Sequence, residues 1–158
     1  MCIRDRDYTL DNAAANVQAL ITGEQVTDTL TVTSFDGSDS ETITITIDGD
    51  DDPAVIGGVD TGEVDEDTSL TTSGTLTITD PDAGEEAFVA PVSLAGTYGT
   101  FTFDETTGDW TYAIVQDDPA FDTLDDGQTY QDTLDVFSID NTMHTITVTI
   151  NGLSELIP

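Results

Sequence analysis

The sequence predicts an all-β chain built from antiparallel β-sandwich units in tandem. Short stretches in which Ile, Val, Leu or an aromatic residue alternates with Thr recur along the chain, as expected for half-buried strands. Turn residues such as Asp-Gly separate these stretches, and no long segment has the periodicity of a helix. About seven short strands in roughly 100 residues are typical of a β-sandwich. Because this fold hosts many activities, function has to be argued from particular residues.

An internal repeat supports the tandem arrangement. A constant offset aligns Tyr8 with Tyr112 and Leu30 with Leu134, and the alignment slips by one residue after the turn at Asp36. A single-residue deletion in a hairpin turn is a change that a shared fold tolerates. Further aligned pairs are Leu20 with Leu124, Gly23 with Gly127, Asp28 with Asp132, Val32 with Val136, Asp36 with Asp140, Ile43 with Ile146, Ile45 with Val148, Ile47 with Ile150 and Gly49 with Gly152.

The repeat divides the chain into one partial and one nearly complete unit. Residues 1–6 are expected to be extraneous, because they hold the only Cys and both cationic side chains. The predicted organisation is then the C-terminal half of a first repeat (7–50), an acidic-Pro junction (51–53), a second, nearly complete repeat (54–152) and a divergent tail (153–158).

The composition limits the classes of partner. The chain has 33 acidic and 2 basic residues, a formal net charge of −31, and 37% hydrophobic residues. This charge disfavours binding to nucleic acid or to anionic membrane surfaces, and no apolar run approaches the length of a membrane span. Without residues 1–6 no Cys remains, which excludes disulfides and thiolate metal sites.

The elements follow in chain order. Asp11–Thr22 has weak helical character, and at most one helical turn is expected there. Leu30 and Val32 alternate with Thr, a turn follows at Phe35–Ser38, and a second strand then carries Ile at alternate positions, so a hairpin with one buried face is predicted. The second repeat has the same pattern at Leu134, Val136, Ile146, Val148 and Ile150.

Two more strand pairs are predicted between the junction and that second hairpin. Leu76 and Ile78 alternate with Thr, and a turn at Glu105–Gly108 joins a strand with Phe101 to a strand with Trp110 and Tyr112. The aromatic faces are expected to pair across this hairpin and to supply much of the core.

The stretch Ile47–Val55, IDGDDDPAV, separates the two copies and concentrates negative charge. Asp50, Asp51 and Asp52 are consecutive and repel one another unless a cation lies among them. Calcium is a suitable ion because it prefers oxygen ligands. A solvated acidic turn is the alternative, and these residues alone leave both open. The stretch is not an EF-hand, since Pro53 stands where that loop needs Gly.

The order of motifs resembles that of a VCBS repeat. The motifs are Glu66-Asp67, SGTLTITDPDAG (73–84), GTYGTFTFDETTGDWTY (96–112), Leu-x-x-Gly (124–127), DTLDVFSID (132–140) and the ITVTI ending. The resemblance covers nearly all of residues 7–152. It implies cadherin-like or immunoglobulin-like modules that act as calcium-stiffened stalk repeats in a large secreted or surface-attached bacterial adhesin of the RTX type. Such a repeat would lie outside the cell, contact neighbouring repeats of the same chain, and support adhesion and biofilm formation.

Topology then suggests two groups of calcium ligands. If Ser73–Thr79 runs back toward the junction, the next loop returns there, which predicts a junction site of Asp50, Asp52, Asp80, Asp82 and Glu24. The same reasoning places a second group at the far end: Glu66, Asp67, Asp125 and Asp126. The chain continues past Asn151 without a second acidic-Pro linker, so the far-end site is expected to be incomplete.

Other functions remain as alternatives. No catalytic residues are predicted: His144 is the only histidine, no Cys or suitable Ser motif accompanies it, and it is expected to be a plain surface residue. Trp110 and Tyr112 could form a platform for a glycan or a protein receptor, but alternating positions on a strand favour core packing. A third possibility is an accessory spacer of a secreted enzyme. An exposed Trp110 would favour the ligand-binding module.

Overall fold

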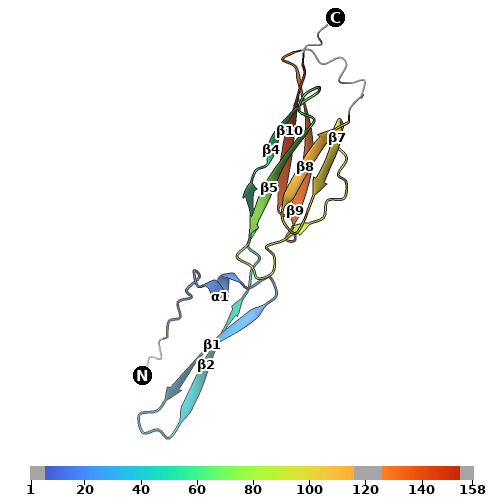
Figure 1. The fold of residues 1–158 in the computed structure, drawn as a ribbon. Helices are drawn as coiled ribbons and strands as arrows, with labels where there is room; N and C mark the ends of the chain where they lie inside the picture. The colour runs from blue at the N-terminus through green and yellow to red at the C-terminus, as the bar shows by residue number, and fades with distance from the viewer. Residues whose placement is uncertain (1–5, 116–125, 154–158) are drawn as a thin grey trace, which may run out of the picture. The chain divides into compact units, whose positions relative to one another are not determined.

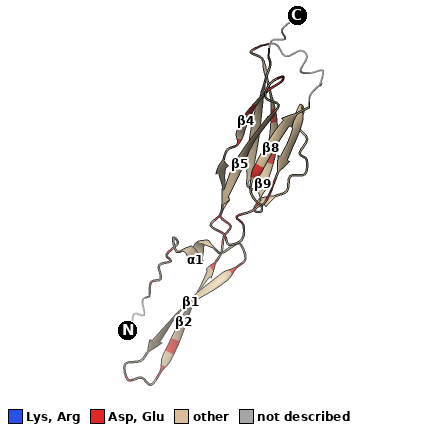
Figure 2. Cartoon of the chain, in the orientation of Figure 1, with Lys and Arg blue, Asp and Glu red and all other residues tan. Residues whose placement is uncertain are grey.

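The computed structural model of the 158-residue chain describes residues 6–115 and 126–153. These residues form two compact units that divide between Asp52 and Pro53 (Figure 1). Unit 1 runs up to Asp52 and includes the short segment Pro81–Ala83, whereas unit 2 comprises Pro53–Asp80 and the residues from Gly84 onward. Acidic residues occur throughout both units (Figure 2).

Unit 1 consists of one helical turn and one hairpin. Helix α1 spans Ala15–Gln18, and the strands β1 (Gln25–Thr33) and β2 (Ser40–Asp48) form a two-stranded antiparallel sheet. The helix is a single turn, as the sequence predicts, because its few apolar residues and absent side-chain cap give it little support. No helix in the described part of the chain is long and apolar enough to cross a membrane.

Unit 2 is a sandwich of two four-stranded sheets. The strand order is β4-β10-β9-β6 in one sheet and β3-β5-β8-β7 in the other. All pairs are antiparallel except β4 with β10. The strands are β3 (Val55–Gly58), β4 (Thr61–Asp65), β5 (Thr71–Thr79), β6 (Phe88–Val89), β7 (Gly99–Phe103), β8 (Asp109–Ile114), β9 (Thr129–Ser138) and β10 (Met143–Asn151).

The chain changes sheets between β3 and β4. Strand β3 pairs with β5 in one sheet, and two residues later β4 pairs with β10 in the other. Gly58 makes the change possible because its φ is +101°, and a Cβ there would clash with the carbonyl oxygen of Thr75. The N–H of Val59 then donates to that same carbonyl at 2.9 Å. The segment Val55–Asp65 therefore contributes one strand to each layer of the sandwich.

The core of unit 2 lies between the sheets and is rich in aromatic residues. Trp110 and Tyr112 are fully buried, and Phe101 lies opposite Tyr112 in the β7–β8 register with their ring centroids 4.7 Å apart. The predicted pairing of aromatic faces is therefore confirmed. The remaining core members are Val64, Leu76, Phe88, Ile114, Leu134, Val136, Ile146, Val148 and Ile150. Two packed, mainly antiparallel sheets confirm the prediction of an all-β sandwich of the immunoglobulin-like or cadherin-like class.

The hairpins β1–β2 and β9–β10 share one register. Leu30 lies opposite Ile43, and the aligned residue Leu134 lies opposite Ile146. The one-residue slip falls in the turn, since Thr33 pairs with Ser40 whereas the aligned Phe137 pairs with Met143. The hydrogen bond that follows each hairpin is also repeated, from Gly49 N–H to Glu24 O and from Gly152 N–H to Gln128 O, each at 2.9 Å.

Candidate metal site

The acidic linker and the loop after β5 provide the candidate site. Asp82 belongs to this loop and is buried, with 1% of its surface exposed. The N–H of Asp52 donates to Asp82 Oδ2 at 2.5 Å. An ionised carboxylate needs strong hydrogen-bond or electropositive partners when it leaves water, and the Asp52 N–H is one of them. Asp82 is therefore a buried carboxylate that is bonded to the backbone of the acidic linker.

Asp51, Asp82 and Glu85 bring three carboxylates together. Each offers one oxygen, and these oxygens lie within 4.8 Å of one another. Asp51 is exposed and Glu85 is half-buried. Three negative charges at this separation repel one another, and a cation among them removes the repulsion. Because the donors are all oxygens, the group fits a hard cation such as calcium, with water or carbonyl oxygens completing the six to eight ligands that calcium takes.

The group agrees only in part with the ligands predicted from sequence. Asp82 was predicted, whereas Asp51 and Glu85 were not. Asp52 contributes its backbone N–H to Asp82, and its carboxylate is not in the group. Three other predicted junction ligands also lie outside the group: Asp50 and Glu24, which are exposed, and Asp80, which is half-buried. As ligands, these four residues remain predictions.

The sequence carries a partial signal for the ligands Asp51 and Glu85, which were not predicted. Gly84 has a φ of +87°, and this turn brings Glu85 back toward Asp82 although only two residues separate them. Asp51 is the middle residue of the acidic run, and the choice among three adjacent carboxylates depends on backbone direction, which composition does not specify. The detectable signal was therefore the sequence Asp82-Ala83-Gly84-Glu85, in which a glycine turn separates two acidic residues.

Among the described residues, the predicted far-end ligands do not form a group of carboxylates. The Glu66 carboxylate accepts a hydrogen bond from Leu153 N–H at 2.7 Å, and the Glu66 N–H donates to Asn151 O at 3.2 Å. Asp67 and Asp126 are exposed. Asp125 lies outside the described residues. A far-end calcium site remains a prediction, and Glu66 has a structural partner there.

Asp132 is a buried carboxylate with a full set of hydrogen-bond donors. It is 3% exposed and accepts hydrogen bonds from the N–H groups of Thr97, Tyr98 and Gly99, at 2.8, 2.9 and 3.1 Å. The Tyr112 hydroxyl donates to it at 2.7 Å. Burial, together with this hydrogen bond and the Asp132 charge, raises the pKa of Tyr112. Asp132 thus anchors the loop before β7 to β9. An acidic residue on the apolar face of a predicted strand, repeated at Asp28, was the sequence signal for it.

Asp140 fixes the start of the sandwich. Its carboxylate accepts hydrogen bonds from the Ala54 N–H at 2.9 Å and from the Thr142 hydroxyl at 2.8 Å, and also from the Ser138 hydroxyl. Desolvation raises the pKa of Asp140, but these hydrogen bonds outweigh it and lower the pKa well below its ordinary value. The aligned Asp36 has the same turn role in unit 1, where hydrogen bonds from Ser38 and then Ser34 lower its pKa to about 2.

Trp110 is part of the core, which leaves no glycan platform at Trp110 and Tyr112. Both side chains are fully buried, and the Trp110 indole N–H donates to Val59 O at 2.7 Å. His144 is half-buried rather than a plain surface residue, and its Nε2 lies 3.1 Å from Asp60 Oδ2. The Trp110 indole and the His144 imidazole thus contact Val59 and Asp60, where the chain passes from one sheet to the other between β3 and β4.

Fold and site together define an all-β sandwich module with an oxygen-donor carboxylate group beside its acidic linker. Among solved structures, the chain is similar to "mouse clustered PcdhgC3 EC1-3", at 15% identity and a TM-score of 0.48 over 93% of this chain and 47% of that one. It is also similar to "PcdhgB3 EC1-4", at 16% identity and a TM-score of 0.37 over 81% of this chain and 39% of that one. The chain thus spans about half, or less, of the length of these structures. No protein-family model and no curated protein matches the sequence.

Proposed function

We propose that the chain is a calcium-stiffened stalk repeat of a large secreted or surface-attached bacterial adhesin, supporting cell adhesion and biofilm formation. The observation that carries the proposal is the group Asp51, Asp82 and Glu85, in which a buried carboxylate has two others close by. The VCBS-like motif order supports the same function. Its partners are neighbouring repeats of the same chain, its location is extracellular, and any receptor is bound by other domains.

The acidic residues of the linker and of the β5–β6 loop carry the mechanism. Bound calcium supplies positive charge and an oxygen-coordinating centre. The Asp82 carboxylate accepts a hydrogen bond from the Asp52 N–H and therefore fixes the backbone of the linker where the acidic run meets Pro53. Asp51 and Glu85 would complete the carboxylate ligands. With their repulsion removed, the linker and the loop are held together, whereas the uncompensated charges favour a more open linker.

The size of the effect follows from mass action. Extracellular modules bind calcium with a Kd of roughly 0.1 to 1 mM. At a hundredfold excess over Kd, one site adds about 2.7 kcal/mol to the free energy of unfolding. For a domain of this size, that corresponds to a rise of about 10 °C in Tm. The effect is specific for calcium over magnesium, because magnesium dehydrates reluctantly and demands a stricter octahedral geometry.

The test compares thermal melts in chelator, in calcium and in magnesium for the unaltered chain and for three variants. Asp51→Asn and Asp82→Asn each remove a charge from the group. Asp50→Asn is the matched control, since it removes an exposed neighbouring charge that lies outside the group. The quantity compared is the calcium-dependent rise in Tm, because Asp82→Asn also weakens the bond to Asp52 and lowers Tm in chelator.

We expect both group variants to lose most of the calcium-dependent rise and the control to keep it. A loss confined to Asp50→Asn, or to an additional Asp80→Asn variant, would move the site to the ligands predicted from sequence. No rise in the unaltered chain would remove calcium from the proposal and leave a metal-independent spacer. Small-angle scattering in calcium and in chelator tests the stiffening separately, and the same dimensions in both conditions would contradict it.

A further inference from the structure

The outer face of one sheet of unit 2 carries a row of exposed apolar side chains, called here the Phe137 row: Val89, Phe137 and Met143. In the strand register Phe137 lies opposite Val89 of β6 on one side and opposite Met143 of β10 on the other. The exposed fractions are 47% for Val89, 39% for Phe137 and 58% for Met143. Exposed apolar side chains next to one another on a sheet are typical of an interaction surface, whereas isolated ones are not.

The rest of the outer face of β9 and β10 is polar. Side chains on this face alternate with the buried residues of the two strands. Apart from the row, the outward residues from Gln131 to Asn151 are Gln131, Thr133, Asp135, Thr145, Thr147, Thr149 and Asn151. The apolar row is therefore confined to the end of the sheet next to the β9–β10 turn.

The internal repeat shows that the hairpin does not need this row in order to form. In unit 1 the positions aligned with Phe137 and Met143 are occupied by Thr33 and Ser40, which lie opposite each other in the β1–β2 register. Both of these polar residues are exposed. A hairpin with the same register thus forms with hydroxyl side chains at these positions, so strand pairing does not explain the apolar pair of unit 2.

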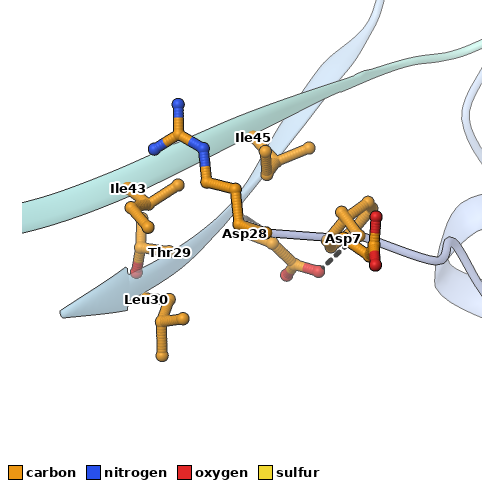
Figure 3. Close-up of a pocket in the computed structure, with 8 residues that line it drawn as sticks. Asp7, Asp28, Thr29, Leu30, Ile43 and Ile45 are labelled. Carbon is orange, nitrogen blue, oxygen red and sulfur yellow. Dashed lines mark hydrogen bonds between the residues drawn. The ribbon is translucent and has the colours of Figure 1, made fainter. Parts of the chain in front are cut away.

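The exposed aliphatic residues of unit 1 have a different origin. Leu30 and Ile43 line an open pocket of about 300 Å³ beside Asp28 (Figure 3). The residues aligned with them, Leu134 and Ile146, are buried in the core of unit 2. The core pattern of the repeat therefore explains the apolar residues at this pocket, whereas it does not explain the Phe137 row.

The row ends at an edge of the sheet. Strand β6 is the last strand in the order β4-β10-β9-β6. The Ile139 N–H donates to Ala87 O at 3.1 Å, so the alternation of an antiparallel pair turns the N–H and C=O of Phe88 away from β9. An extended peptide can pair with these two groups, and its next side chain then lies beside Val89 on the outer face.

The charge of the surroundings indicates the kind of partner. Unit 2 contains neither Lys nor Arg. The exposed Glu86 lies just before β6, and the exposed Asp135 lies on the outer face two residues before Phe137. Basic side chains next to the apolar contact are attracted by these carboxylates, whereas acidic ones are repelled. A second copy of the chain is disfavoured as the occupant, because each copy has a net charge of −31.

We propose that the Phe137 row binds an extended basic segment of another protein, which pairs with the edge of β6 and packs a large apolar side chain against Val89 and Phe137. Phe137 is two strand spacings, about 10 Å, from the added strand. Only a large side chain such as that of Trp spans this distance together with the Phe137 ring. The row does not include the carboxylates Asp51, Asp82 and Glu85, so this binding is independent of calcium.

The test uses a short synthetic peptide in which Lys and Thr alternate, with the central Lys replaced by Trp. One control peptide has Ser in place of this Trp, and a second has Glu in place of every Lys. Binding to the full chain is followed by NMR of the backbone amides, which gives both the Kd and the residues affected. We expect shifts confined to β6 and the adjoining end of β9, slower hydrogen exchange of the Phe88 amide, and weaker binding of both control peptides.

Phe137→Thr introduces the residue that unit 1 has at the aligned position, and Val89→Thr shortens the row at the edge strand. Each should weaken binding of the Trp peptide by roughly tenfold or more, because each removes an apolar partner of the Trp side chain. Val55→Thr is the matched control, since Val55 is 67% exposed on the other sheet, and it should leave the Kd unchanged. Thermal melts followed by Trp110 fluorescence show whether each variant is folded, and if Phe137→Thr is not, Val89→Thr carries the test.

Four results would overturn the proposal. Equal affinity for the Trp and Ser peptides would mean diffuse attraction to an acidic protein, and an unchanged Phe88 amide would exclude pairing at the edge of β6. An equal loss of affinity in Val55→Thr and Phe137→Thr would show that the row is not the site. Sedimentation of the chain alone could also reveal a dimer in which the β6 amides are protected, which would make a second copy the occupant.

Discussion

Asp132→Asn is the sharpest test of how the sandwich of unit 2 is held together. Asp132 Oδ2 accepts hydrogen bonds from Tyr98 N–H, Gly99 N–H and the Tyr112 hydroxyl, and Oδ1 accepts one from Thr97 N–H. An asparagine can keep only one of these oxygens as an acceptor. Its amide nitrogen would face a donor, which leaves at least one N–H without an acceptor and makes the other bonds neutral.

The magnitude follows from the number and the kind of bonds. A hydrogen bond to a charged group contributes about 1.5–3 kcal/mol, and a buried donor left unsatisfied costs about 1–3 kcal/mol. Losing one charged bond and weakening three others gives a loss of about 3–5 kcal/mol in the free energy of unfolding. That corresponds to a fall of about 12 °C or more in Tm for a domain of this size.

The assay is thermal or denaturant unfolding followed by Trp110 fluorescence. Trp110 is the only tryptophan of the chain and is fully buried in unit 2, so its signal reports that unit. Asp135→Asn is the matched control, because Asp135 is an exposed residue of the same strand whose carboxylate bonds only the Thr145 hydroxyl among the described residues. An Asp132→Asn variant no less stable than this control would refute the anchoring argument.

Three smaller predictions concern packing and pH. Gly74→Ala should lower the free energy of unfolding by about 1–3 kcal/mol, because the new Cβ would lie 2.8 Å from the Trp110 ring. Gly57→Ala is the control, since the nearest contact of its Cβ would be at 3.7 Å. An equal loss in both variants would contradict the packing argument. The raised pKa of Tyr112 means that its stabilising effect is present below about pH 10 and is lost above it, by up to about 1.4 kcal/mol per pH unit. Tyr112→Phe should remove that part of the alkaline slope, and an unchanged slope would count against it. In unit 1 the hydrogen bonds from Ser38 and Ser34 lower the pKa of Asp36 to about 2, so the stabilising effect of Asp36 is present above about pH 4 and is lost as the pH falls through 2. In an NMR titration of the Ser38→Ala variant, the pKa of Asp36 should move up toward its ordinary value.

Local sequence determined the strands and the repeat. Alternation of apolar residues with Thr places side chains on opposite faces of a strand, and this predicted the buried rows at Leu134 and Val136 on β9 and at Ile146 and Val148 on β10. The one-residue slip after Asp36 predicted that the second hairpin has a shorter turn, and the two registers show this. These features depend on near neighbours, so a pattern in the sequence is sufficient to reveal them.

Only the tertiary structure decided which carboxylates meet. Asp51, Asp82 and Glu85 come from two separated segments, and their approach depends on the direction of the backbone at the linker and at Gly84. Asp28 and Asp132 occupy aligned positions, yet Asp132 is buried with four donors whereas Asp28 is exposed with one among the described residues. The difference is the presence of a covering sheet, and a sheet assembled from distant strands is not encoded in the residues around either aspartate. An acidic run therefore indicated that a cation could bind, but the identity of the oxygens that face one another depended on the fold.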